Sequence, residues 1–264
     1  MDTQFDKLVH HIFGAGLLFA ACMTSAMAQN QSEATPTVFP ANFRGEECDT
    51  VVASLKSNAS KKDEFESTVE YEKRAQTTLA SISASGRSLA EPKFFVNSEN
   101  VSAVYDADRG SMKVYGSLRL STNVSDAVRY ASTVIVTTRS AQTSKYQGQN
   151  QFGASAEVKK YRDEVCGVAF LNLSPVTNHE WMGAIEFPLS ADIARRSKGN
   201  IVIVYLAHLA PPLLVNYRQY VAPTMSAPSE ILVTGDALTA VLERFFVVDK
   251  RTGDVLYERP YTPR

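Results

Sequence analysis

The sequence predicts an α+β protein that is mainly β, with N-terminal helices packed on a twisted antiparallel sheet, most simply a β-sandwich. Two observations support this fold class. Apolar residues recur every three or four positions between residues 45 and 90, and from 91 to 264 they give way to short runs of branched and aromatic residues. A hydrophobic content of 44% in 264 residues suffices for a sizeable core. We therefore expect an N-terminal helical segment, 45–90, followed by a β-rich domain, 91–264.

The first 28 residues have the pattern of a secretory signal peptide. The apolar run Ile12–Met23 is shorter than the roughly 20 residues that a membrane-spanning helix needs. Small residues in Ala26-Met27-Ala28 stand at the positions that signal peptidase recognises, so we expect cleavage before Gln29. The pattern predicts a periplasmic protein in which residues 29–44, polar and containing two prolines, form a flexible leader.

A second interpretation concerns Cys22. Residues Phe19–Cys22 resemble a bacterial lipobox, in which the cysteine receives lipid, although Phe19 stands where Leu is usual. Lipidation would anchor the protein to a membrane that faces the periplasm. The sequence leaves both interpretations open, and a membrane is an expected partner only if Cys22 is lipidated.

The charge of the mature chain limits its partners. Cleavage would remove one of the 27 basic residues, Lys7, and two of the 28 acidic ones, Asp2 and Asp6. The mature chain is therefore formally neutral. Nucleic acids require a basic stripe, and anionic membrane surfaces attract polybasic segments. The composition therefore argues against both, and no nucleic-acid partner is expected.

Only Cys48 and Cys166 follow the expected cleavage site. In an oxidising compartment, a lone pair of cysteines most simply forms a disulfide. The alternative is two buried free thiols. The chain contains no CxxC motif that would indicate redox catalysis.

The N-terminal segment predicts two helices. The first begins after Gly45, has acidic residues in its first turn and ends near Asn58. The second starts with a capping box, in which Ser67 accepts from the Glu70 backbone while the Glu70 side chain reaches back. It runs to about Ser83, and its apolar stripe consists of Tyr71, Ala75, Leu79 and Ile82.

The start of this second helix resembles a pattern in uncharacterised secreted and envelope proteins of Gram-negative bacteria. The pattern has an acid, Phe and Glu before the capping box, then Glu, an aromatic residue and Arg. The resemblance implies an envelope setting and carries over no catalytic residue. The matching residues are Glu64, Phe65, Glu66, Ser67, Thr68, Glu70, Tyr71 and Arg74.

After Gly86 the sequence predicts strands, together with one short helix that Ser190 caps. Two of the turns, in residues 104–115 and 247–257, combine an Asp with a following Gly and predict hairpins. Prolines should lie at strand ends, because proline cannot donate to a sheet. The expected strands are Lys93–Asn97, Ser111–Leu118, Tyr130–Thr138, Val165–Leu171, Trp181–Phe187, Ile201–Leu209, Pro228–Val233 and Leu238–Val248.

The sequence indicates no catalytic or metal-binding motif. His179-Glu180 starts like a zinc-protease helix, but Gly183 stands where the second histidine is needed. We therefore predict no catalytic residues, no metal and no cofactor. The alternative is a periplasmic hydrolase that acts on an envelope polymer, with Glu180 and Glu186 on one strand face as acid and base.

The segment Arg139–Gly153 is the candidate binding loop. It is rich in amides, and long loops in compact domains often bind partners, although a solvated hairpin tip is the simpler interpretation. We predict a non-catalytic binding or structural role, with an envelope protein or a wall polymer as the partner. The candidate binding residues are Tyr146, Gln149, Asn150, Gln151 and Phe152.

Overall fold

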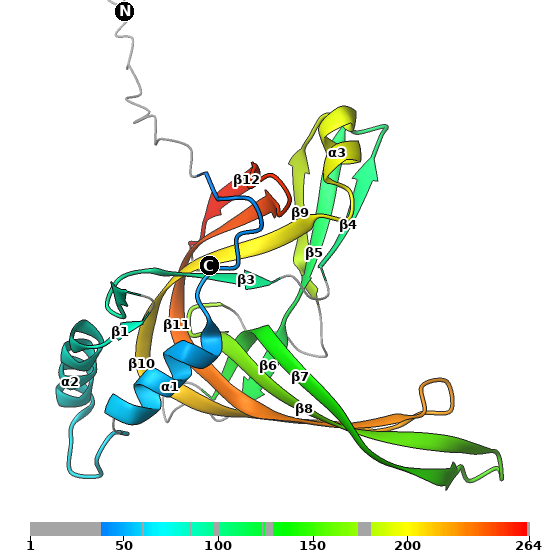
Figure 1. Cartoon of the computed structure of the whole chain (residues 1–264), viewed down its shortest axis with the longest axis horizontal. Helices are drawn as coiled ribbons and strands as arrows, with labels where there is room; N and C mark the ends of the chain where they lie inside the picture. Colours follow the sequence, from blue (N-terminus) through cyan, green and yellow to red (C-terminus); the bar gives the residue numbers. More distant parts are fainter. Residues whose placement is uncertain are drawn as a thin grey trace, which may run out of the picture. The chain divides into compact units, whose positions relative to one another are not determined.

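The structure is mainly β, with N-terminal helices packed on a mixed, mostly antiparallel sheet, which confirms the predicted fold class (Figure 1). The expected signal peptide, the lipobox with Cys22 and the first part of the leader lie outside the described residues. Within the described ranges, no helix is long and apolar enough to cross a bilayer. The computed structural model describes residues 38–59, 61–84, 86–97, 101–122, 124, 129–173 and 181–262.

The strands form three sheets. The largest has seven strands in the order β3-β10-β11-β8-β7-β6, with β12 paired to β11. Strands β4, β5 and β9 form a second sheet, and β1 and β2 pair with each other. The strands are β1 Ser83–Ala84, β2 Arg87–Ser88, β3 Lys93–Asn97, β4 Val101–Asp106, β5 Ser111–Ser117, β6 Arg119–Thr122, β7 Tyr130–Gln149, β8 Ser155–Phe170, β9 Trp181–Pro188, β10 Ile201–Val221, β11 Ser229–Asp249 and β12 Val255–Pro260.

The sheet is not antiparallel throughout, so this part of the prediction is wrong. Strands β8 and β11 run parallel, from Lys159 opposite Ser229 to Phe170 opposite Ala240. Parallel neighbours require a long crossover connection, which here consists of β9, helix α3 (Ala191–Ser197) and β10. Such a pairing depends on contacts between residues that are far apart in the sequence, so no local sequence pattern predicts it.

The long strands also differ from their predicted lengths. Strands β10 and β11 have 21 residues each, and the predicted strands 228–233 and 238–248 are both part of β11. Pro211–Pro212 lies inside β10 rather than at its end. The prolines are tolerated because β10 and β11 shift register between Leu209 and Leu214, where the ladder is interrupted.

The predicted helices and their caps are confirmed. Helix α1 covers Cys48–Asn58 and α2 covers Thr68–Ser81, while the Ser190 side chain accepts from Ile193 at the start of α3. The capping box of α2 is present, with both of its reciprocal hydrogen bonds. Its apolar stripe faces the core, and the Tyr71 hydroxyl donates to the carbonyl of Pro212 in β10 at 3.0 Å.

The motif at the start of α2 closes the preceding segment onto the helix. Arg74 Nε donates to Glu66 Oε1 at 2.8 Å, and Arg74 Nη2 donates to Glu66 Oε2 at 2.7 Å and to the Lys61 carbonyl at 3.1 Å. The hydrogen bond from Arg74 lowers the pKa of the Glu66 carboxyl. Phe65 takes no part in this arrangement, since 89% of its surface is exposed.

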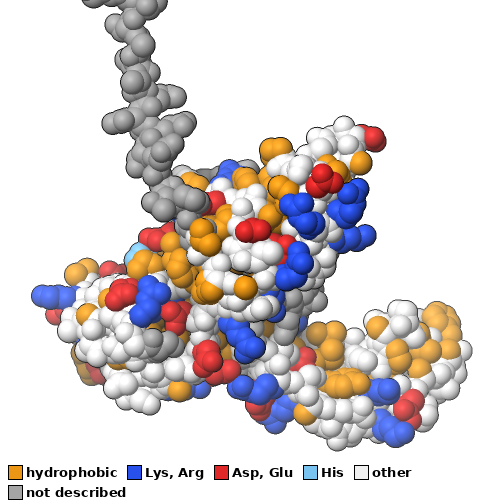
Figure 2. Space-filling view, turned by 45° about the horizontal axis from the view of Figure 1, so that its top comes forward, with side chains coloured by type: hydrophobic (Ala, Val, Ile, Leu, Met, Phe, Trp, Pro, Cys, Tyr) orange, Lys and Arg blue, Asp and Glu red, His pale blue; other side chains and the backbone are white. Residues whose placement is uncertain are grey.

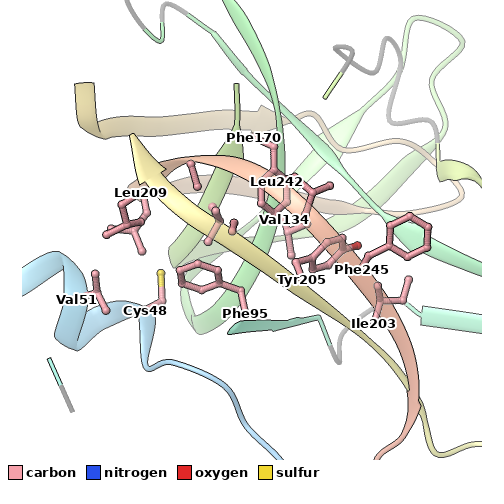
Figure 3. Packing of buried hydrophobic residues seen from close by; sticks show 14 of the residues in the cluster. Cys48, Val51, Phe95, Val134, Phe170, Ile203, Tyr205, Leu209, Leu242 and Phe245 are labelled. Carbon is pink, nitrogen blue, oxygen red and sulfur yellow. The ribbon is translucent and has the colours of Figure 1, made fainter. Parts of the chain in front are cut away.

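Cys48 and Cys166 form a disulfide with their Cα atoms 5.9 Å apart, which confirms the bridge over the free thiols. The bond joins the first residue of α1 to β8 inside the main core. Figure 3 shows Cys48 beside Val51 of α1 and Phe95 of β3. A buried disulfide indicates an oxidising location outside the cytoplasm.

The predicted β-sandwich is not confirmed. The three-stranded sheet does pack on the core of the large sheet: Phe187 of β9 stacks on Tyr257 of β12 with ring centroids 4.9 Å apart. However, α1 and α2 contribute Leu55 and Leu79 to the same core. Helices and a small sheet therefore share the role that a second large sheet would have in a sandwich.

Lys93 gives a testable prediction about stability. Its side chain is fully buried at the start of β3, and its Nζ has no hydrogen-bond partner among the described residues. Burial lowers the pKa of the Lys93 ammonium, and nearby Glu46 opposes this shift only in part. We expect Lys93→Met to raise the free energy of unfolding at neutral pH by about 1 kcal/mol, because a buried charge without a partner is unfavourable.

The stability gained by Lys93→Met should shrink as the pH rises from the lowered pKa of folded Lys93 towards 10.5, the ordinary value for lysine. In this pH range the wild-type side chain loses its charge on folding, so the wild type no longer has to bury a charged group. Urea unfolding at neutral and alkaline pH measures both effects. A variant less stable than the wild type at neutral pH would show that Nζ is paired.

Candidate functional site

The predicted binding loop is mostly a strand. Residues Arg139–Gln149 form the second half of β7 and pair with β8, from Arg139 opposite Glu164 to Gln149 opposite Ser155. Only 150–154 form a turn. The sequence conceals this strand because both of its faces are largely solvated, so it lacks the alternation of apolar and polar residues that predicts a strand.

The parallel pairing of β8 and β11 brings two distant turns together. Each strand begins directly after a turn, so the turn 150–154 before β8 and the turn 222–228 before β11 lie at the same end of the sheet. Lys159 donates its backbone N–H to the Pro228 carbonyl at 3.0 Å, which joins the second turn to β8. We call 150–154 and 222–228 the distal turns.

A groove of about 590 Å³ lies between the distal turns. We call it the distal groove. Among the described residues, no charged side chain lines it, and its surface is formed by aromatic, aliphatic and amide groups and the Thr224 side chain. The residues that define it here are Tyr146, Gln149, Val158, Pro223, Met225 and Pro228.

Tyr146 is held by contacts with two neighbouring strands. Its hydroxyl donates to Glu230 Oε2 at 3.1 Å, and the Lys160 Nζ lies 5.0 Å from its ring centroid and 3.2 Å from Glu230 Oε1. Burial, followed by the hydrogen bond to Glu230, raises the pKa of the Tyr146 hydroxyl. The ring is therefore a fixed, neutral surface beside the groove.

The other predicted binding residues shape the first distal turn. Gln149 Nε2 donates to the Gly153 carbonyl at 3.0 Å, and Asn150 Oδ1 accepts from the backbone N–H groups of Phe152 and Ala154, both at 3.0 Å. Gln149 and Asn150 also line the groove, whereas Gln151 and Phe152 lie in the turn. The structure therefore brings Tyr146, Gln149 and Asn150 together.

Exposed apolar side chains gather at this end of the sheet. Five of the eleven large hydrophobic side chains that are exposed in the described chain lie here, and Phe152 is 84% exposed. Figure 2 shows hydrophobic surface grouped at the lower right, where these hairpins end. The five are Tyr146, Phe152, Tyr220, Val221 and Met225.

No protein-family model, curated protein or solved structure matches this chain. The chemistry of the distal groove and of the remaining polar side chains is therefore the basis for any functional conclusion. Sequence reasoning missed the second turn, with Pro223 and Met225. The only sequence signal of this turn is an uncharged run with two prolines.

Of the two glutamates considered for catalysis, only Glu186 is among the described residues, and it does not line the distal groove. His179 and Glu180 are outside the described residues, so the pair Glu180 and Glu186 is not placed. Glu186 accepts from Ser111 Oγ at 3.0 Å and lies 3.6 Å from Lys113 Nζ. Within the described ranges, His, Cys, Asp and Glu side chains form no group of three that could hold a metal ion.

Proposed function

We propose that this chain is an exported bacterial envelope protein with a non-catalytic binding role, and that the distal groove holds its partner. The disulfide supports a periplasmic setting, because such bonds persist in oxidising compartments. One observation carries the proposal: the groove coincides with the densest group of exposed apolar side chains in the described chain. Exposed apolar groups of this kind mark interaction sites.

The chemistry of the groove favours a neutral partner surface. Tyr146 offers a ring whose position is fixed by Glu230, and the amides of Gln149 and Asn150 offer hydrogen bonds beside it. Tyrosine is frequent at binding sites because it presents a large apolar area with little conformational freedom to lose. Such a lining suits an envelope protein or the sugar rings of a wall polymer.

The test is site-specific photo-crosslinking in the producing cells. With a photoreactive residue at Gln147, which lines the groove, we expect one defined covalent adduct, either protein or wall fragment. Tyr146→Ala should reduce that adduct by about tenfold, because aromatic anchors dominate binding energies. The same probe at Arg251, in the turn between β11 and β12, should give none.

Tyr130→Ala is the matched control. Tyr130 is a second tyrosine of β7 with similar exposure, 40% against 38% for Tyr146, but it does not line the groove. Its replacement should leave the adduct unchanged. Equal adduct formation by Tyr146→Ala and the wild type would rule out the distal groove as the binding site.

A further inference from the structure

The distal turns and the strand ends beside them carry no charged side chain. Residues 146–156 contain no charged side chain, and neither do residues 219–229, although 21% of the chain is charged. The pairing of β8 with β11 places these two runs side by side. The exposed side chains of Phe152 and Met225 therefore extend from turns that carry no charge of their own.

Basic residues exceed acidic ones directly behind the turns. The region behind the turns is bounded by one row of paired residues, in which Arg162 lies opposite Leu232 and Leu232 lies opposite Tyr220. From the turns up to and including this row, the strands carry four basic side chains and two acidic ones. The pairs Lys145–Glu157 (2.9 Å) and Lys160–Glu230 (3.2 Å) use two of the basic residues. Lys159 and Arg162 remain as an excess of positive charge in a chain whose formal net charge is −1.

The residue types follow an order along the hairpins. Phe152 is in the outermost turn, Tyr146 and Met225 lie beside the groove, and Lys145 and Lys159 pair with each other one residue further back. With a rise of about 3.4 Å per residue, the end of β7 at Gln149 is about 10 Å beyond Tyr146. Peripheral membrane elements bury their apolar side chains about 5–10 Å deep, with tyrosine at the headgroups and lysine at the phosphates.

We propose that the distal turns insert shallowly into the surface of an anionic phospholipid bilayer. Phe152 enters the boundary of the acyl chains, Tyr146 and Met225 lie among the headgroups, and Lys159 and Arg162 face lipid phosphates. This goes beyond the proposed function, because it sets the distal groove at a membrane surface while leaving its partner open. It also provides membrane contact that does not depend on a lipidated Cys22.

The arrangement favours lipid over an acidic protein. An acidic protein partner would require basic side chains in the contact surface itself, whereas here they lie behind two uncharged turns. Burying one large apolar side chain favours the bound state by roughly 10- to 100-fold. The few side chains available therefore predict reversible binding.

The experiment is co-sedimentation of the protein, purified from the host envelope, with vesicles of phosphatidylglycerol and phosphatidylcholine in equal amounts. We expect the wild type to sediment with them, and to sediment less with phosphatidylcholine alone or in high salt. Phe152→Ser should weaken partitioning about tenfold. Phe65→Ser is the matched control, because Phe65 is similarly exposed, at 89% against 84% for Phe152, but precedes α2 outside the distal turns.

A second variant reports insertion directly. Made together with Trp181→Phe, which removes the native tryptophan emission, Phe152→Trp should show a blue shift of its fluorescence on adding phosphatidylglycerol vesicles, and no shift with phosphatidylcholine alone in high salt. A wild type that stays in the supernatant, an unshifted Phe152→Trp, or equal losses for Phe152→Ser and Phe65→Ser would each overturn the proposal. Crosslinking at Gln147 without vesicle binding would instead identify a protein or wall polymer as the only partner and leave the proposed function intact.

Discussion

Replacing both cysteines, as in Cys48→Ala/Cys166→Ala, should lower the free energy of unfolding by about 4 kcal/mol. The disulfide joins residues 118 apart in the sequence, and closing a loop of that size restricts the unfolded chain by roughly 4–5 kcal/mol in the chain-entropy model. Both residues are buried in the main core, so the loss also leaves space beside Val51 and Phe95. Urea unfolding followed by circular dichroism measures the difference.

Reduction of the wild type provides the control for this prediction. A thiol reductant should lower the unfolding midpoint of the wild type towards that of the double variant and leave the variant unchanged. If the variant and the oxidised wild type unfolded at the same urea concentration, the bridge would contribute nothing to stability. The single variants Cys48→Ala and Cys166→Ala should each resemble the double variant, since either one removes the bond.

The parts of the fold that the sequence predicts are those decided by neighbouring residues. The capping box of Ser67 and Glu70 requires only residues three apart, and both hairpin turns are determined by an Asp and a following Gly. The disulfide is predictable for a different reason: if the expected cleavage removes Cys22, only Cys48 and Cys166 are left to pair.

The parts that the sequence does not predict depend on distant contacts. The parallel pair β8–β11 forms only after β9, α3 and β10 have returned the chain to the same sheet. Strand β10 continues through Pro211–Pro212 because its neighbour tolerates a register shift there. Neither feature can be predicted from a local sequence pattern, because each depends on how the neighbouring strand pairs.

The candidate site is likewise predictable from the sequence only in part. Tyr146 and Gln149 were recognisable from the amide-rich segment around them, but Met225 comes from a turn more than seventy residues later. A net charge taken over the whole chain also argued against an anionic membrane surface. Only the strand register shows that the strand ends behind the turns carry more basic side chains than acidic ones.

Gly253→Ala should destabilise the protein by about 3 kcal/mol or more. Gly253 lies in the turn between β11 and β12 with φ of 85°, a left-handed conformation that costs a residue with a Cβ about 1 kcal/mol. A Cβ at this position would also lie 1.9 Å from the carbonyl oxygen of Phe39. Because that atom belongs to the backbone, the clash cannot be relieved by a side-chain rotation, and the segment around Phe39 must move.

Gly110→Ala separates the two contributions. Gly110 occupies the corresponding position in the turn between β4 and β5, with φ of 60°, but a Cβ there would meet nothing within 4 Å. Its replacement should cost only the backbone term, about 1 kcal/mol. The additional destabilisation by Gly253→Ala then measures how firmly the segment around Phe39 is held in place. Two contacts hold it: the Phe39 ring packs on Phe246, with ring centroids 5.3 Å apart, and the Asn42 backbone N–H donates to the Lys250 carbonyl. Equal destabilisation by the two variants would mean that residues around Phe39 move aside freely and add little to the stability of the sheet.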